Sequence, residues 1–160
     1  MAIKVGDRVP NSTFTVMTAD GPKAKTTDEV FKGKKVVLFA VPGAFTPTCH
    51  RNHLPSFVKN EAAIKAKGID TIAVTGVNDV FVMDAWKKAS GSDSIEFLAD
   101  GSGNWAKAVG LSADLSEHGL GIRSQRYAML VQDGVVKALN VEDAPVKAEI
   151  SSADNILKAL

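Results

Sequence analysis

The chain has 160 residues and a formal net charge of +1, with 45% hydrophobic and 23% charged residues. These values are typical of one globular domain, which we expect to span residues 1–160, and they argue against a protein that binds nucleic acid or a membrane surface through its charge. A single cysteine, no apolar signal core near the N-terminus and no stretch that could span a bilayer predict a cytoplasmic protein without internal disulfides.

Strand and helix patterns alternate along the chain, which predicts an α/β domain. Apolar or alternating runs predict strands at 13–17, 35–41, 71–75 and 95–98, followed by a hairpin of 125–132 and 135–141. Caps and apolar faces predict a short helix after Thr26 and further helices at 47–67, 79–89, 104–109 and 153–160. Residues 111–124 are expected to form an irregular loop. Together these elements indicate a thioredoxin-like fold, in which helices flank a mixed central sheet.

The single cysteine, Cys49, follows the buried-type strand 35–41 at the start of a predicted helix. Thr46 is suited to the N-cap and Pro47 to the first helical position, so Cys49 falls in the first turn. Unpaired backbone N–H groups and the helix dipole favour a thiolate there. The alternative is a small hydrophobic side chain in the core. Pro55 is expected to kink the helix or to remove one of its hydrogen bonds.

Two neighbours of Cys49 have more than one interpretation. Thr46 stands three residues before Cys49, where a Cys-x-x-Cys dithiol would have its first cysteine, which leaves chemistry by a single thiolate. Its hydroxyl would either cap the helix or act at the reacting centre. Pro42, at the end of the preceding strand, would either form a rigid wall beside the thiolate or be an ordinary loop proline.

The spacing Pro42-x3-Thr46-x2-Cys49 resembles the Pro-x3-Thr-x2-Cys signature of the peroxiredoxins. The run from Val41 to Cys49 is similar to the peroxiredoxin-5, or type II, subfamily. Further similar segments are spread over most of the chain, and they include His53-Leu54-Pro55, Val77-Asn78-Asp79, Leu98-Ala99-Asp100-Gly101 and Arg126-Tyr127-Ala128.

The resemblance implies a peroxidase in which Cys49 attacks hydrogen peroxide or a small organic hydroperoxide and becomes a sulfenic acid. It also implies that Thr46 orients the peroxide, that Pro42 shields the site, and that Arg126 holds the thiolate and polarises the peroxide. A guanidinium with fixed donors suits that last task. Arg123, in the preceding loop, is interpreted instead as a solvated charge.

The chain departs from many members of this family because it has no second, resolving cysteine. Val74, Ser151 and Ser152 occupy regions in which relatives carry one. An external thiol must therefore resolve the sulfenic acid: glutathione, with or without glutaredoxin, or thioredoxin. We expect the glutathione and glutaredoxin system. The resemblance also implies a homodimer packed through loops around the active site, and no cofactor.

Other functions are weaker interpretations of the same residues. Cys49, His50 and His53 could suggest a metal site. Zinc normally needs three or four ligands, however, and the chain has no other cysteine, while His118 is far away in a glycine-rich loop, so no metal is expected. His53 is expected to cap or pack near the active-site helix and is assigned no catalytic role. A cysteine hydrolase is disfavoured because nothing positions a histidine against Cys49. A redox sensor and a thioredoxin-like scaffold remain as alternatives. The sensor would react once with peroxide, whereas a peroxidase would turn over.

Overall fold

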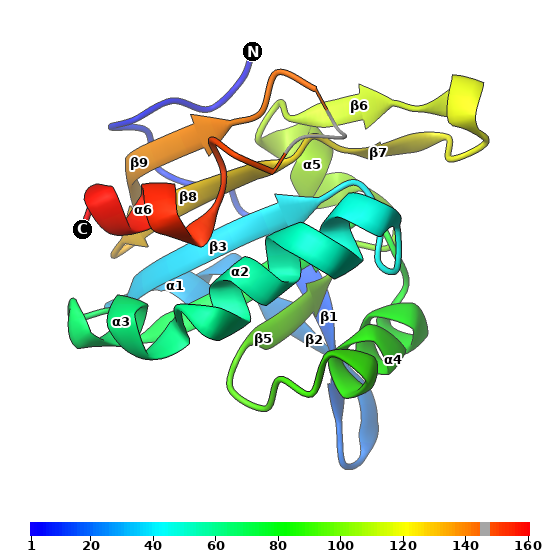
Figure 1. Ribbon diagram of the computed structural model, residues 1–160. Coiled ribbons are helices and arrows are strands. Elements are labelled where there is room, and N and C mark those ends of the chain that lie inside the picture. Colours follow the sequence, from blue (N-terminus) through cyan, green and yellow to red (C-terminus); the bar gives the residue numbers. More distant parts are fainter. Residues whose placement is uncertain (145–147) are drawn as a thin grey trace.

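The computed structural model describes residues 1–144 and 148–160. A mixed sheet of seven strands runs through its centre in the order β2-β1-β5-β4-β3-β8-β9 (Figure 1). The strands are β1 (Thr13–Thr18), β2 (Gly21–Thr26), β3 (Lys35–Val41), β4 (Thr71–Gly76), β5 (Glu96–Ala99), β8 (Tyr127–Gln132) and β9 (Val135–Val141). β3, β4 and β5 are parallel, whereas β1, β2, β8 and β9 join through antiparallel pairs.

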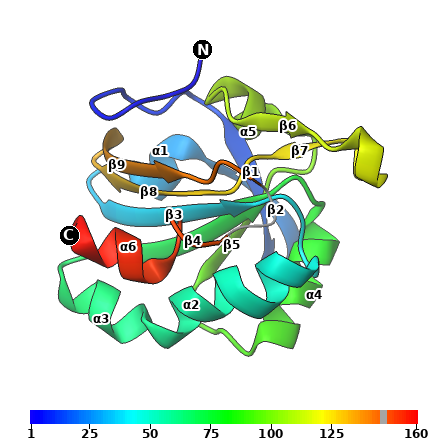
Figure 2. The same cartoon turned by 45° about the horizontal axis from the view of Figure 1, so that its top comes forward.

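Helices cover both faces of this sheet, as Figures 1 and 2 show. One face carries α2 (Leu54–Lys59), α3 (Glu61–Ala66), α4 (Val80–Ser90) and α6 (Ala153–Lys158), and the other carries α1 (Thr27–Phe31) and α5 (Asn104–Ala108). This arrangement confirms the predicted thioredoxin-like fold. No helix in the described ranges is both long and apolar enough to cross a membrane.

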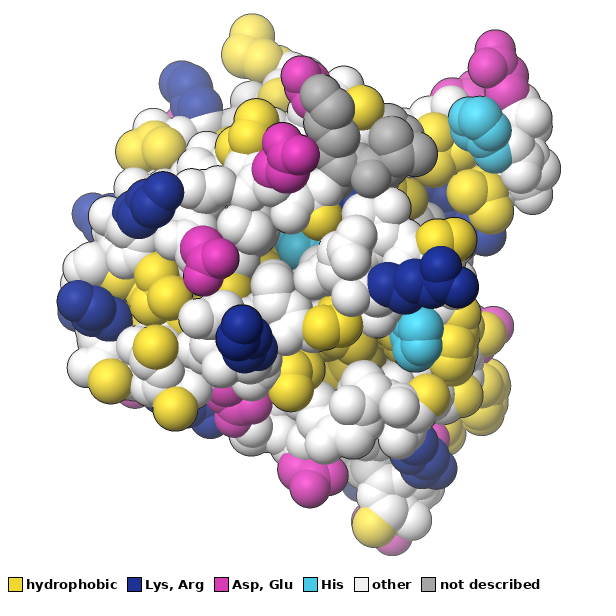
Figure 3. Space-filling view, in the orientation of Figure 1, with side chains coloured by type: hydrophobic (Ala, Val, Ile, Leu, Met, Phe, Trp, Pro, Cys, Tyr) yellow, Lys and Arg dark blue, Asp and Glu magenta, His cyan; other side chains and the backbone are white. Residues whose placement is uncertain are grey.

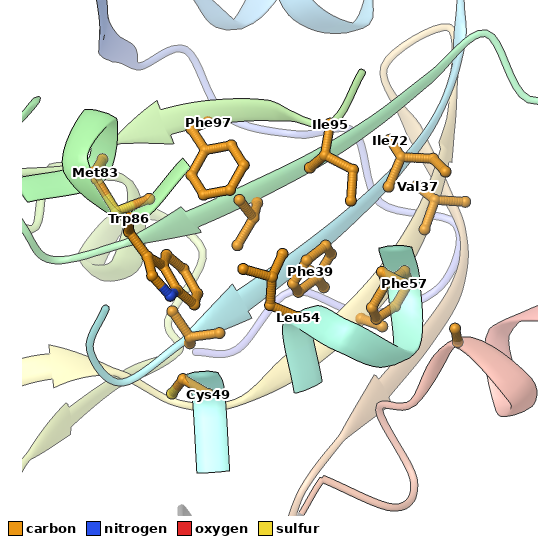
Figure 4. Packing of buried hydrophobic residues seen from close by; sticks show 14 of the residues in the cluster. Val37, Phe39, Cys49, Leu54, Phe57, Ile72, Met83, Trp86, Ile95 and Phe97 are labelled. Atoms are coloured by element: carbon orange, nitrogen blue, oxygen red, sulfur yellow. The ribbon is translucent and has the colours of Figure 1, made fainter. Parts of the chain in front are cut away.

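The central strand β3 supplies side chains to two hydrophobic clusters, one on each face. Phe39 and its odd-numbered neighbours face α2 and α4, while Leu38 and its even-numbered neighbours face α1 and α5. The period-two geometry of a strand explains this division, and burial on both faces explains the continuous apolar run. Cys49 lies in the first cluster, near Trp86 and Leu54 (Figure 4).

One strand was not predicted, and one prediction about a connection was wrong. Residues 21–26, beyond the turn that follows β1, form the edge strand β2, whose partly exposed, polar sequence gives no buried pattern. The region 111–124 is not irregular throughout, because β6 (Ser112–Asp114) pairs with β7 (Ile122–Ser124) across a 3-10 turn. These three strands exist through backbone pairing rather than through burial of an apolar face.

The predicted helix 47–67 is interrupted twice. It passes through a π turn (Cys49–His53), in which the Leu54 N–H donates to the Cys49 carbonyl, and then breaks at Asn60 between α2 and α3. Pro55 lies two residues after the π turn, and its ring disfavours regular α-helical packing against the carbonyl four residues earlier. The irregularity expected from Pro55 thus takes the form of a widened turn that contains Cys49.

One polar side chain lies within the aromatic part of this core. The His53 ring is completely buried, with its centroid 5.0 Å from that of Phe39 and 5.6 Å from that of Phe57. Burial, and secondarily the positive charge of Arg126, lower the pKa of His53 from 6.5 to about 3. The folded protein therefore holds this imidazole neutral.

This burial makes the free energy of unfolding depend on pH. Between pH 6.5 and about 3 the unfolded chain protonates His53 while the folded chain does not, so the contribution is complete above this window and declines as the pH falls through it. We expect His53→Gln, which cannot titrate, to remove a slope of about 1.4 kcal/mol per pH unit. Urea unfolding of both proteins at several pH values measures this difference, and equal slopes would contradict it.

Candidate active site

The loop between β3 and the π turn is fixed by hydrogen bonds to its neighbours. The Ala44 N–H donates to the side-chain oxygen of Asn78 at 2.8 Å, which ties the loop to the segment after β4. Phe45 adopts a positive φ of 65°, a conformation that a non-glycine residue keeps only when its surroundings impose it. The backbone that leads to Cys49 is therefore held in one path.

Thr46 lies at the start of the helix, as predicted. Its carbonyl accepts from the His50 N–H at 2.8 Å, which is the first hydrogen bond of the helix, and Pro47 follows at the first helical position. The Thr46 hydroxyl donates to the Gly43 carbonyl at 2.7 Å. This bond fixes the hydroxyl next to the first helical turn and leaves its oxygen lone pairs to accept a hydrogen from a ligand.

Cys49 is buried in that first turn and meets Arg126, which lies 77 residues further along the chain. The terminal NH2 group of Arg126 donates to the Cys49 Sγ at 2.9 Å. Arg126 directly precedes β8, which pairs with β3, and this pairing brings the two residues together. The contact places a permanent positive charge directly against the sulfur.

Arg126 has a second contact that the sequence did not predict. Its NH1 group lies 3.0 Å from Nδ1 of His53, whose Nε2 lies 3.0 Å from the carbonyl oxygen of Ser151. The packing assigned to His53 is therefore only part of its surroundings. Its position four residues after Cys49 was the available signal, because that spacing places two side chains on the same side of a helix.

Pro42 and Arg123 form another pair beside the site. Pro42 is buried and directly follows β3. Its carbonyl accepts a hydrogen bond from Arg123 NH1 at 3.3 Å, and Arg123 Nε donates to the Leu120 carbonyl at 2.8 Å. The interpretation of Arg123 as a solvated loop charge was wrong, since its side chain bridges two loops. A Cβ on Gly43 would lie 2.9 Å from Arg123 NH1, so a larger residue there would have to displace the end of the arginine side chain.

A pocket of about 380 Å³ opens beside these residues. It is lined by Pro42, Thr46, Pro47, Thr48, Leu115, His118, Leu120 and Arg126. Thus three of the four predicted site residues line the pocket, and the fourth, Cys49, touches one of them. The sequence did not predict the wall formed by Leu115 and Leu120, which belongs to the region interpreted as an irregular loop.

The other two histidines lie in different places: His118 lines the pocket, whereas His50 bonds to a partner away from the sulfur. Nδ1 of His50 accepts from the Trp86 indole N–H at 3.1 Å. In residues 1–144 and 148–160, no three His, Cys, Asp or Glu side chains lie close enough together to hold a metal ion. The histidine geometry therefore gives no support to a cysteine hydrolase, and the donor set gives none to a metal centre.

Comparison with known proteins shows which family the chain belongs to. The family model described as Redoxin matches residues 4–157. Peroxiredoxin-2B from Arabidopsis thaliana is 45% identical over 160 residues, which cover 99% of this chain and 98% of that relative. The chloroplastic Peroxiredoxin-2E of the same plant is 46% identical over 164 residues, covering 99% of this chain and 70% of the relative.

The solved structures agree with the sequence relatives. The crystal structure of reduced Prx3 from Vibrio vulnificus in complex with hydrogen peroxide superposes with a TM-score of 0.93 and 50% identity, covering 98% of each chain. The fold, the full-length similarity and the single cysteine within a peroxiredoxin-like signature lead to one assignment. This chain belongs to the redoxin family and, within it, to the type II peroxiredoxins, which are thiol-dependent peroxidases with an antioxidant function.

Proposed function

We propose that Cys49 is the nucleophile of this peroxidase and that Arg126, Thr46 and Pro42 form the site around it. The observation that carries this proposal is the contact of 2.9 Å between the Arg126 guanidinium and the Cys49 sulfur. A buried positive charge stabilises both the attacking thiolate and the negative charge that develops on the peroxide oxygens. The substrates are hydrogen peroxide and small organic hydroperoxides, which the pocket of about 380 Å³ is large enough to admit.

The reaction begins with attack of the Cys49 thiolate on the terminal oxygen of the peroxide. The S–O bond forms while the O–O bond breaks, and the leaving alkoxide or hydroxide takes a proton to become an alcohol or water. The sulfur is oxidised to a sulfenic acid and the peroxide is reduced by the same two electrons. Arg126 donors aimed at these oxygens lower the barrier because they need no reorientation during the reaction.

Thr46 and Pro42 hold the substrate in this reaction. The Thr46 hydroxyl is fixed by its bond to the Gly43 carbonyl, and its oxygen accepts the hydrogen of the bound peroxide. Pro42 is buried at the pocket wall, has no backbone N–H and limits the access of water to the thiolate. Both residues line the same pocket as Arg126, which supports the proposed arrangement.

An external thiol completes the cycle, because the chain contains one cysteine. The thiol attacks the sulfenic sulfur and releases water, which leaves a mixed disulfide with Cys49. A second thiol then exchanges with this disulfide and restores the Cys49 thiol. We propose glutathione as the first thiol and glutaredoxin as the protein that removes it. Thioredoxin is the alternative reductant.

We further propose that residues 1–160 act as one domain, as a cytoplasmic homodimer packed through the loops around the active site. Phe45, Phe81 and Ile122 are exposed large apolar side chains on the loop before the helix, on α4 and on β7. These are positions from which a second copy would cover the rim of the site. Charges of both signs are scattered over the face in Figure 3, which does not favour a partner selected by charge.

The assignment of the nucleophile leads to the first test of this function. Cys49→Ser is expected to abolish peroxide consumption, because a hydroxyl is far less ionised and less nucleophilic than a thiolate. The measurement is peroxide loss in the presence of excess thiol, with circular dichroism as the control for folding. Undiminished turnover by the folded variant would contradict the assignment of Cys49 as the nucleophile.

The proposed role of Arg126 depends on its geometry as well as its charge. Arg126→Lys keeps the charge but loses the planar pair of donors, and we expect the rate constant for Cys49 oxidation to fall by about 10²-fold. Arg51→Lys, the same substitution at an exposed position of the π turn, is the matched control and should stay within about threefold of the unchanged protein. Stopped-flow oxidation by hydrogen peroxide measures both rates, and equal rates for the two variants would refute the role.

The reductant is tested by steady-state turnover with the two thiol systems side by side. We expect sustained peroxide reduction with glutathione, glutaredoxin, glutathione reductase and NADPH, and an adduct of one glutathione on Cys49 in intact-mass spectra when glutaredoxin is omitted. Turnover with thioredoxin alone would replace the proposed reductant. A single stoichiometric oxidation with either system would favour a sensor over an enzyme.

A further inference from the structure

A buried chain of hydrogen bonds continues beyond Arg126 into the C-terminal part of the protein. It passes from the Cys49 sulfur to Arg126, then to His53, Ser151 and Glu142. All five side chains are buried, with Arg126 2% and Glu142 5% exposed. We refer to Arg126, His53, Ser151 and Glu142 as the Arg126 anchor.

We infer that His53 is a positioning residue for the peroxidase reaction, and that the C-terminal segment holds it in the tautomer that accepts a hydrogen bond from Arg126. The role of Arg126 in the reaction is part of the proposed function, so the inference rests on that function. The anchor adds a reason why the guanidinium points at the sulfur.

The tautomer follows from the partners of the two ring nitrogens. The Ser151 carbonyl can only accept, so the His53 Nε2 at 3.0 Å must carry the hydrogen. Nδ1 is then the acceptor for Arg126 NH1, also at 3.0 Å. A protonated imidazole would instead direct an N–H toward the guanidinium, which has no lone pair to receive it. Burial supports the neutral form by lowering the pKa of His53 to about 3.

Glu142 fixes the other end of the anchor. Its Oε2 accepts from both the N–H and the hydroxyl of Ser151, each at 2.7 Å. Its own N–H donates to the Arg126 carbonyl at 2.9 Å. The residue after β9 therefore holds the backbone of Arg126 and, through Ser151, the acceptor of the His53 hydrogen. Ser151 lies where relatives can carry a resolving cysteine, and here it is part of the active-site support.

The contacts with His53 and Cys49 fix the orientation of the guanidinium. With NH1 held by His53, the planar group directs NH2 toward the Cys49 sulfur. Loss of this acceptor would remove one of the contacts that hold the guanidinium in this orientation, and the group could then rotate. A small rotation is enough to misplace the donor, and misplacement of a catalytic group by about 1 Å can cost as much as 10²-fold in rate.

A packing role alone makes a different prediction. His53 also contacts the rings of Phe39 and Phe57, so any replacement that disturbs this packing would lower stability. It would not by itself change the ionisation of Cys49 or its rate of oxidation in the folded protein. The decisive readout is therefore the reactivity of the sulfur, measured separately from stability.

The first experiment compares His53→Leu, which has neither polar group, with His53→Gln, whose amide can both accept from Arg126 and donate to Ser151. We expect His53→Leu to slow stopped-flow oxidation of Cys49 by hydrogen peroxide by about tenfold or more and to shift iodoacetamide alkylation of Cys49 to higher pH, with His53→Gln restoring both. Equal behaviour of the two variants, whether slow or fast, would overturn the inference.

Ser56→Ala serves as the matched control on the same helix. The Ser56 hydroxyl accepts from the Ala153 N–H and donates to the His53 carbonyl, so its loss loosens the attachment of the C-terminal segment without removing the His53 ring. Its oxidation rate should stay within about threefold of the unchanged protein. A rate as low as that of His53→Leu would show that general loosening, and not the anchor, is responsible. If His53→Leu does not fold, His53→Met takes its place.

A double-mutant cycle tests the outer half of the anchor. Glu142→Ala alone should slow Cys49 oxidation, and it should add little in the His53→Leu background because both changes interrupt one chain. Independent effects would remove Glu142 and Ser151 from the inference. Arg126→Lys is measured in parallel: an unchanged rate there refutes the proposed function, whereas a slow Arg126→Lys with a normal His53→Leu refutes only the anchor.

Discussion

The charge on Arg126 is the constraint on which the rest of the site depends, since only 2% of this residue is exposed to water. Burial of an unpaired ion costs on the order of several kcal/mol, so acceptors must surround it. The Cys49 sulfur and the His53 ring provide two of them. In the proposed function, the same contact that satisfies the guanidinium also prepares the nucleophile.

The fold meets this constraint by bringing three segments of the chain together around Arg126. The π turn that follows β3 carries Cys49 and His53, the strand β8 beside β3 begins directly after Arg126, and the C-terminal segment supplies the Ser151 carbonyl. The resulting site has two sides. A buried polar side fixes the guanidinium, and a pocket with an apolar wall from Leu115 and Leu120 opens on the other side. Because the chain has one cysteine, the reducing thiol must also come from outside.

Sequence patterns were sufficient for the main elements of the fold and insufficient for the weakest ones. The strands at 35–41 and 71–75 were predicted because their burial on both faces requires continuous apolar runs. The edge strand β2 and the pair β6 and β7 were missed because they are short and carry polar or partly exposed side chains. Their stability comes from backbone pairing with neighbours, which leaves little trace in the order of residue types.

The same division holds for the candidate site. The sequence by itself determined that Cys49 stands in the first turn of a helix after a buried strand, with Thr46 and Pro42 close to it, because these relations depend on local spacing. Family resemblance added Arg126. Only the tertiary structure decided that Arg126 contacts both Cys49 and His53, across 77 and 73 residues, and that Ser151 accepts from His53 across 98 residues. Such contacts are set by how strands pair and helices pack, which no local pattern of residues specifies.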